Sequence, residues 1–132
     1  MYNYFKRTED YKLYVSKGNE IIIMDIPIQT FLNNLLKKAL TDLTSREKTI
    51  KKVLGFKSKV PIYIDKNNLF MCIKSYRLEN SFYINYFSIV SYEYIGETII
   101  INFRDKHSIK LRKKHVFQMQ IDKCRSILNY LN

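Results

Sequence analysis

The spacing of the apolar residues changes several times along the chain, and this change of period limits the possible folds more than any other feature. Residues 11–26 contain two apolar runs separated by Lys17-Gly18-Asn19, a pattern typical of a β-hairpin. After Pro27 the apolar residues recur at intervals of three and four, which predicts an amphipathic helix over residues 31–43. The first third of the chain therefore combines strands with a helix.

A second helix is predicted to follow at once, with Ser45 as its N-cap, Glu47 in its first turn and Gly55 at its end. A helical projection gives this segment an apolar side and a basic side opposite to it. The apolar side consists of Ile50, Val53 and Leu54, and the basic side consists of Lys48, Lys51 and Lys52. The helix is therefore expected to be anchored by one face and to present cations on the other.

The second half of the chain begins with a strand pattern and ends with a helical one. Short apolar runs, several rich in aromatic and β-branched residues, occupy residues 60–103, and in residues 107–111 apolar and basic side chains alternate. Apolar residues spaced by four and three from Phe117 to Leu131 predict a long C-terminal amphipathic helix. We predict an α+β fold in a single domain spanning residues 1–132: an antiparallel β-sheet with two helices in the N-terminal half and the C-terminal helix.

Positive charge is concentrated in two blocks of the sequence. The chain has 132 residues and a formal net charge of +11. Residues 37–60 and residues 104–125 each contain eight Lys or Arg residues and two carboxylates, which gives each block a net charge of +6. Two such blocks are what a binding surface for a polyanion requires, although a lysine-rich surface that only increases solubility would produce the same composition.

The sequence gives little support to an enzyme, a metal site or a membrane protein. It contains no glycine-rich phosphate loop, no serine-nucleophile motif and no HExxH motif. His107, His115, Cys72 and Cys124 lack the spacing of metal ligands, and Cys124 is expected to be a small core residue. We predict no catalytic residue, no metal and no cofactor. With no membrane span and no signal peptide in the sequence, a cytoplasmic protein is expected.

Two features can be interpreted in more than one way. The aromatic residues Tyr83, Tyr86, Phe87, Tyr92 and Tyr94 could stack on unpaired bases, but strands favour aromatics and the core interpretation is preferred. The run at residues 108–115 could be a solvated turn. Its four closely spaced cations favour phosphate contact instead; they are Lys110, Arg112, Lys113 and Lys114.

The order and spacing of several short elements between residues 31 and 131 resemble the ComK family, the competence transcription factors of low-GC Gram-positive bacteria. The segment 44–65 is similar to the family's Gly-Arg-Lys stretch and its Lys-x-Pro-Ile strand, with Arg46, Lys59, Pro61 and Ile62 at matching places. The final helix matches the family at Gln120 and Arg125. The chain diverges where Ser45, Glu47, Ser81 and Tyr83 replace the family's usual residues, and we expect it to lack the longer C-terminal tail of many members.

The resemblance implies binding to AT-rich double-stranded DNA, largely in the minor groove, by a protein that forms a homo-oligomer and has RNA polymerase as a further candidate partner. An activator, a modulator or a mobile-element copy would all fit. A narrow A·T minor groove attracts Arg and Lys side chains, so Arg46 is the candidate for groove insertion and the lysines are candidates for phosphate contact. The predicted DNA-binding residues are Arg46, Lys48, Lys51, Lys52, Lys57, Lys59, Lys110, Arg112, Lys113 and Lys114.

A second class of function stays open at this point. Several strands followed by one long C-terminal helix also resemble, loosely, a pleckstrin-homology-like domain, whose basic loops would bind an anionic membrane or an acidic protein. If the two basic blocks form one continuous face, the DNA-binding hypothesis gains. If they lie on opposite sides of the molecule, a single DNA footprint fails and the solubility explanation gains.

Overall fold

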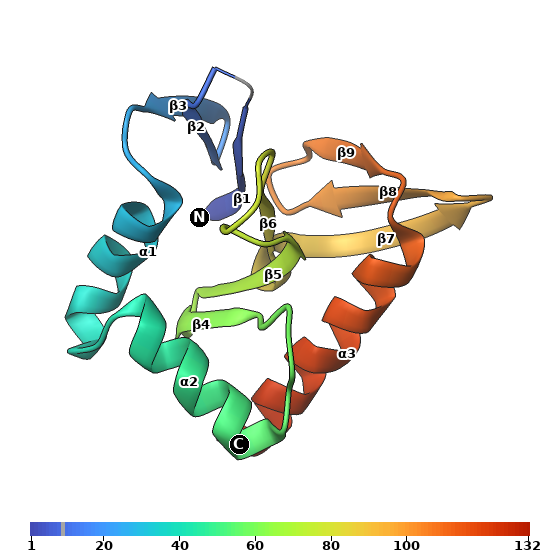
Figure 1. Ribbon diagram of the computed structural model, residues 1–132. Coiled ribbons are helices and arrows are strands. Elements are labelled where there is room, and N and C mark those ends of the chain that lie inside the picture. The colour runs from blue at the N-terminus through green and yellow to red at the C-terminus, as the bar shows by residue number, and fades with distance from the viewer. Residues whose placement is uncertain (9) are drawn as a thin grey trace.

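The computed structural model describes residues 1–8 and 10–132, and within them the predicted α+β fold is confirmed. Three α-helices and nine strands occur in this part of the chain (Figure 1). The chain runs through β1 (Tyr2–Arg7), β2 (Leu13–Lys17), β3 (Glu20–Met24), α1 (Ile28–Leu36), α2 (Leu43–Leu54), β4 (Ile62–Asp65), β5 (Asn68–Lys74), β6 (Phe82–Asn85), β7 (Ile89–Ile95), β8 (Thr98–Phe103), β9 (Ser108–Leu111) and α3 (Lys114–Leu131).

The strands form two antiparallel sheets rather than the single sheet that we predicted. Six strands pair in the order β3-β2-β1-β6-β5-β4, and three pair in the order β7-β8-β9. The chain passes from one sheet to the other at Asn85, whose buried amide accepts hydrogen bonds from the N–H groups of Leu69 and Phe87 and donates to the carbonyl oxygen of Tyr2. A short 3-10 helix over residues 86–88 then separates β6 from β7.

Each face of the six-stranded sheet is covered by different elements (Figure 1). α1 packs on one face through Phe31, Leu32 and Leu36. α3 and the three-stranded sheet pack on the other face. α2 contributes Leu43 to the apolar cluster on the α1 side of the sheet and Ile50 to the apolar cluster on the α3 side, so it packs against both. The loop after α2, which holds part of the first basic block, therefore lies close to α3.

The predicted helix over residues 31–43 was wrong in its extent. α1 ends at Leu36 and continues only as a 3-10 turn, and Leu40 adopts a left-handed conformation at φ +58° with 95% of its surface exposed. The side chain of Asn33 accepts a hydrogen bond of 2.7 Å from the N–H of Leu43, and the N-cap of α2 lies three residues before the predicted Ser45. The Asn33 side chain of α1 thus helps to set where α2 begins, which the spacing of apolar residues did not predict.

The N-cap of α2 is Asp42 and not Ser45, because the Asp42 carboxylate accepts a hydrogen bond of 2.8 Å from the Ser45 N–H. The predicted end at Gly55 is confirmed, with Gly55 in the left-handed conformation that a helix C-cap favours. Ile50 is buried, whereas Val53 is exposed and was wrongly assigned to the anchored side. The buried face instead includes Glu47, whose carboxylate accepts a 2.6 Å hydrogen bond from the Tyr76 hydroxyl.

The predictions for the C-terminal half hold more fully. The predicted C-terminal helix is confirmed as α3, which begins at Lys114. Cys72 and Cys124 are free and buried, and burial raises the pKa of both thiols, which disfavours the thiolate.

Within the described residues no three His, Cys, Asp or Glu side chains gather as metal ligands would. None of the helices described here combines the length and hydrophobicity that a membrane span needs.

The interpretation of the aromatic residues as part of the core is confirmed for Tyr83 and Tyr92. Tyr83 is buried and stacks on Phe5 with ring centroids 5.1 Å apart. Tyr92 packs edge-on against Phe117 of α3 at 5.0 Å. Tyr83 belongs to the six-stranded sheet and Tyr92 to the three-stranded sheet, so the five rings do not form one stacking platform.

Candidate nucleic-acid interface

The first basic block follows α2 and the loop after it. Lys48 and Lys52 are fully exposed, Lys51 is half-buried, and the side chains of Lys57 and Lys59 are exposed in the loop over residues 55–61. Both the helix and its C-cap at Gly55 are well defined by their hydrogen bonds. The lysines of this block therefore have a fixed backbone, with Lys48, Lys51 and Lys52 on one side of α2 and Lys57 and Lys59 on the loop.

Arg46 lies apart from these lysines, against an apolar surface. Its guanidinium is 5.9 Å above the ring of Tyr63, and both residues line a groove of about 300 Å³ between α2 and the end of α3. Burial lowers the pKa of Arg46 from its usual value, although the group remains charged at neutral pH. Insertion of Arg46 into a DNA groove would require the side chain to leave this surface.

The loop after α2 is held from behind by α3. The Gln120 side chain, only 1% exposed, donates a 2.7 Å hydrogen bond to the carbonyl oxygen of Lys59 and accepts one of 2.7 Å from the N–H of Cys72 in β5. The ammonium of Lys123 donates to the carbonyl oxygens of Ser58 and Lys59 at 2.7 Å and 3.4 Å. These contacts fix Lys59 at φ +48°, a left-handed conformation that is unfavourable for a lysine.

A cation that sequence reasoning missed joins this loop. Arg77 follows β5 and, with Lys51, Lys57 and Lys59, lines a hollow of about 160 Å³. The Arg77 guanidinium lies 3.6 Å from the Glu47 carboxylate and 4.5 Å above the ring of Tyr76. Arg77 stands alone in the sequence, so only the pairing of distant strands could have indicated its place.

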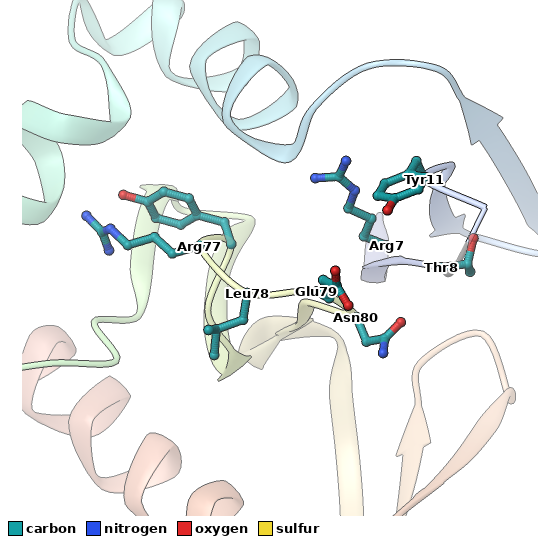
Figure 2. A pocket seen from close by; sticks show the side chains of 8 residues that line it. Arg7, Thr8, Tyr11, Arg77, Leu78, Glu79 and Asn80 are labelled. Carbon is teal, nitrogen blue, oxygen red and sulfur yellow. The ribbon is translucent and has the colours of Figure 1, made fainter.

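Arg77 also borders a second hollow, of about 200 Å³, between the β5–β6 loop and the turn after β1. On the far side of that hollow Arg7 lies 5.1 Å above the ring of Tyr11. Figure 2 shows the Arg77 side chain pointing away from Arg7 and Tyr11. The Arg77 guanidinium therefore belongs to the side of the molecule that carries Lys57 and Lys59.

Four cations of the second basic block lie at the start of α3. Lys110 is exposed on β9, and Arg112, Lys113 and Lys114 are exposed where β9 leads into α3. The alternation predicted for β9 is confirmed, since Leu111 is buried while Lys110 faces solvent. Lys113 occupies the N-cap of α3 without a side-chain cap, and the first turn contains no acidic residue. Cations at the positive end of a helix dipole are unfavourable, so this end of α3 has an excess of positive charge.

Lys114 and Lys123, which both belong to the second block, lie on different sides of α3. Nine positions separate Lys114 from Lys123, which is about 2.5 helical turns or 14 Å and leaves them half a turn apart. Lys114 lies 5.1 Å above the ring of Tyr94 on the side of β7, whereas Lys123 contacts the loop that carries Lys59. The structure thus brings Lys51, Lys57 and Lys59 together with Arg77, and it groups Lys110 to Lys114 separately. A single continuous DNA footprint stays a prediction.

None of the predicted DNA-binding residues is neutralised by an ion pair within residues 1–8 and 10–132. The ion pairs in this part of the chain join Lys12 to Asp25, Arg77 to Glu47, His107 to Asp105 and Arg125 to Asp122. Of the ten predicted residues, eight are exposed, and Arg46 and Lys51 are half-buried. Their positive charges are therefore available to an anionic partner.

Comparison with known proteins identifies one family. The model of the ComK family, described as ComK protein, matches residues 3–132. This match includes β1, β2 and β3, whereas the resemblance noted in the sequence began only at residue 31. No curated protein and no solved structure matches the chain.

Proposed function

The chain belongs to the ComK family of competence transcription factors, and we propose that it regulates transcription by binding double-stranded DNA. The observation that carries this proposal is the state of the ten predicted cations: within the described part of the chain they lie outside the core and form no ion pair. Each phosphate that a cation neutralises releases condensed counterions and adds affinity. We place this activity in the cytoplasm and assign it no catalytic step.

The proposal extends to AT-rich DNA and to the minor groove. The narrow minor groove of A·T tracts has an enhanced negative potential and admits Arg side chains, and this recognition needs few base contacts. Arg46 and Arg112 are the arginines among the predicted residues. Lys48, Lys52 and Lys113 are exposed and suit phosphate contact, because an ammonium acts as a point charge.

The test is a duplex-binding titration with AT-rich and GC-rich probes at several salt concentrations. Contact with six to eight phosphates gives a slope of log K against log salt of roughly −5 to −7. Arg46→Ala should weaken the preference for AT-rich probes, and Lys113→Ala should lower affinity evenly across probes. A slope near zero, or binding to anionic lipid vesicles in preference to both duplexes, would reject DNA binding in favour of the pleckstrin-homology-like alternative.

Self-association is a separate part of the proposal, and we place a second copy of the chain at the edge strand β3. Among the described residues, β3 lies at one end of the six-stranded sheet, with Ile21 and Ile23 more than half exposed. Its pairing with β2 has no bulge, whereas edge strand β7 is bulged near Ile89. A regular, apolar edge strand is a template for pairing with another strand.

Charge also favours β3 for contact between two copies. Residues 18–26 carry Glu20 and Asp25 and no cation, although the whole chain has a net charge of +11. Two copies that meet there avoid the repulsion that most other surfaces would produce. Sedimentation of Ile23→Lys should show a monomer where the unchanged protein is a dimer, with Ile95→Lys on β7 as the control. A dimer that persists in Ile23→Lys would exclude this interface while leaving DNA binding untouched.

RNA polymerase is a further proposed partner, expected from the role of a transcription activator. Its test is independent of the DNA titration, because binding of the protein to purified polymerase can be measured without a promoter. Saturable binding would favour an activator over a modulator that acts only by occupying DNA.

A further inference from the structure

The hollow beside Arg77 collects cations from three separate segments of the chain. Lys51 comes from α2, Lys57 and Lys59 come from the loop that follows it, and Arg77 comes from the end of β5. One carboxylate, that of Glu47, also lines the hollow. Four basic residues and one acidic residue therefore line a space of about 160 Å³, which gives the lining an excess of positive charge.

The carboxylate in this hollow is already engaged. Glu47 accepts a 2.6 Å hydrogen bond from the Tyr76 hydroxyl and lies 3.6 Å from the Arg77 guanidinium. Burial, together with the hydrogen bond to Glu47, raises the pKa of Tyr76 to about 12, so the hydroxyl keeps its proton at neutral pH. Glu47 thus orients Arg77 at the rim and cannot neutralise Lys51, Lys57 and Lys59 as well.

The loop that supplies two of the lysines is held in an unfavourable conformation. A left-handed backbone is unfavourable for a residue with a side chain, and Lys59 adopts it at φ +48°. The buried Gln120 amide holds the carbonyl oxygen of Lys59 at 2.7 Å, and Lys123 holds that of Ser58 at the same distance. Local strain that surrounding contacts maintain is typical of sites that need a fixed geometry.

We propose that this hollow is a binding site for a single phosphate group. The guanidinium of Arg77 offers two parallel N–H donors to phosphate oxygens, and the ammonium groups of Lys57 and Lys59 add charge. The hollow is smaller than the roughly 300–1,000 Å³ of pockets for whole small molecules, so it accepts one phosphate group and not an entire nucleotide. The phosphate is either free in solution or part of a DNA backbone, and only the second source rests on the proposed function.

The first experiment titrates the full chain with inorganic phosphate at constant ionic strength and follows the backbone amides by NMR. Saturable shifts are expected in residues 57–59 and 75–77. Arg77→Gln and Lys57→Gln should each weaken phosphate binding at least fivefold, whereas Lys38→Gln, which changes an exposed lysine of the 3-10 turn after α1, should not. Both substituted side chains are exposed, so the variants should stay folded, and their amide spectra will verify this. Shifts that grow linearly, or that are the same in all variants, would overturn the site.

The second experiment identifies the source of the phosphate. If the site holds a DNA backbone phosphate, Arg77→Gln should reduce the steepness of log K against log salt by about 1 and lower affinity at 0.1 M salt by about eightfold. If phosphate binds saturably but Arg77→Gln leaves DNA affinity unchanged, the ligand is free phosphate. Normal DNA binding without phosphate binding would reject this site and leave the proposed function intact. Phosphate binding without DNA binding would support this site and reject the proposed function.

Discussion

The role of Gln120 gives the sharpest prediction about stability. Its amide is buried and satisfies two backbone groups that have no other strand to pair with: the N–H of Cys72 in β5 and the carbonyl oxygen of Lys59. Gln120→Met has nearly the same volume but offers neither hydrogen bond. The substitution should therefore remove the polar contacts without creating a cavity. The decrease in the free energy of unfolding then measures the penalty of leaving the two backbone groups without partners.

The size of the effect follows from those two groups. A buried backbone group without a partner costs about 1–3 kcal/mol, and the carbonyl of Lys59 keeps a weak contact of 3.4 Å with Lys123. We therefore expect the free energy of unfolding to fall by about 2–4 kcal/mol. For a chain of 132 residues the entropy of unfolding is about 0.28 kcal/mol per kelvin, so Tm should fall by about 7–14 °C.

The assay is thermal unfolding by circular dichroism, with amide hydrogen exchange at Cys72 as a local readout. Gln118→Met is the matched control, because Gln118 lies on the same helix and its side chain makes only exposed hydrogen bonds: it donates to the Asp122 carboxylate at 3.2 Å and accepts from the Tyr94 hydroxyl. It should change Tm by less than about 2 °C, as is usual for surface substitutions. Equal Tm values for the two variants, or unchanged exchange at Cys72, would refute the assignment of Gln120 as the residue that holds the loop.

Two further predictions concern the start of α2. Leu40→Asn should raise the free energy of unfolding by about 0.5–1 kcal/mol in urea titrations, because Leu40 is 95% exposed at φ +58° and asparagine tolerates this conformation better; a loss of stability would contradict this. The hydrogen bond from the Ser45 N–H lowers the pKa of Asp42, so its contribution to stability is present above the usual value of 3.8 and is lost as the pH falls below it. Asp42→Asn should keep the cap and flatten the acid unfolding curve, whereas Asp42→Ala should be less stable at pH 7; identical acid curves for all three proteins would show that Asp42 is not the cap.

The helix boundaries show what apolar spacing can and cannot predict. The spacing of apolar residues correctly predicted α3 and which side chains of β9 face the core, because one face of each element packs on the core. It failed at Leu40, where an apolar residue is in phase with the helix and yet exposed. The deciding contact there is the hydrogen bond that the Leu43 N–H donates to the Asn33 side chain, and Asp42 was a visible competitor to Ser45 as the N-cap. Caps of similar strength cannot be ranked without knowing where the preceding helix ends.

The candidate site shows the same limit over a longer range. The lysines of α2 and its loop were predicted because they are close together in the sequence. Arg77 lies 26 positions beyond Lys51 and reaches the same hollow only because β5 pairs beside β4 and ends there. The passage between the two sheets at Asn85 could in principle have been predicted, because Asn85 is an amide in the middle of an apolar run. Its meaning depended on Leu69 and Tyr2, which it contacts across the sheet.

An uncharged amide, rather than a carboxylate, holds the backbone of the loop that carries Lys57 and Lys59. Gln120 fixes the backbone of Lys59, and Asn85 fixes the passage between the two sheets. A carboxylate in the place of Gln120 could accept the hydrogen bond from Cys72, but it would subtract a charge from the loop whose lysines it positions. An amide fixes the same backbone and leaves the electrostatic field of those lysines intact. Because the side chains of Lys57 and Lys113 are exposed, their substitution should leave the fold almost unchanged. Any loss of binding in those variants therefore reports a lost contact and not a lost structure.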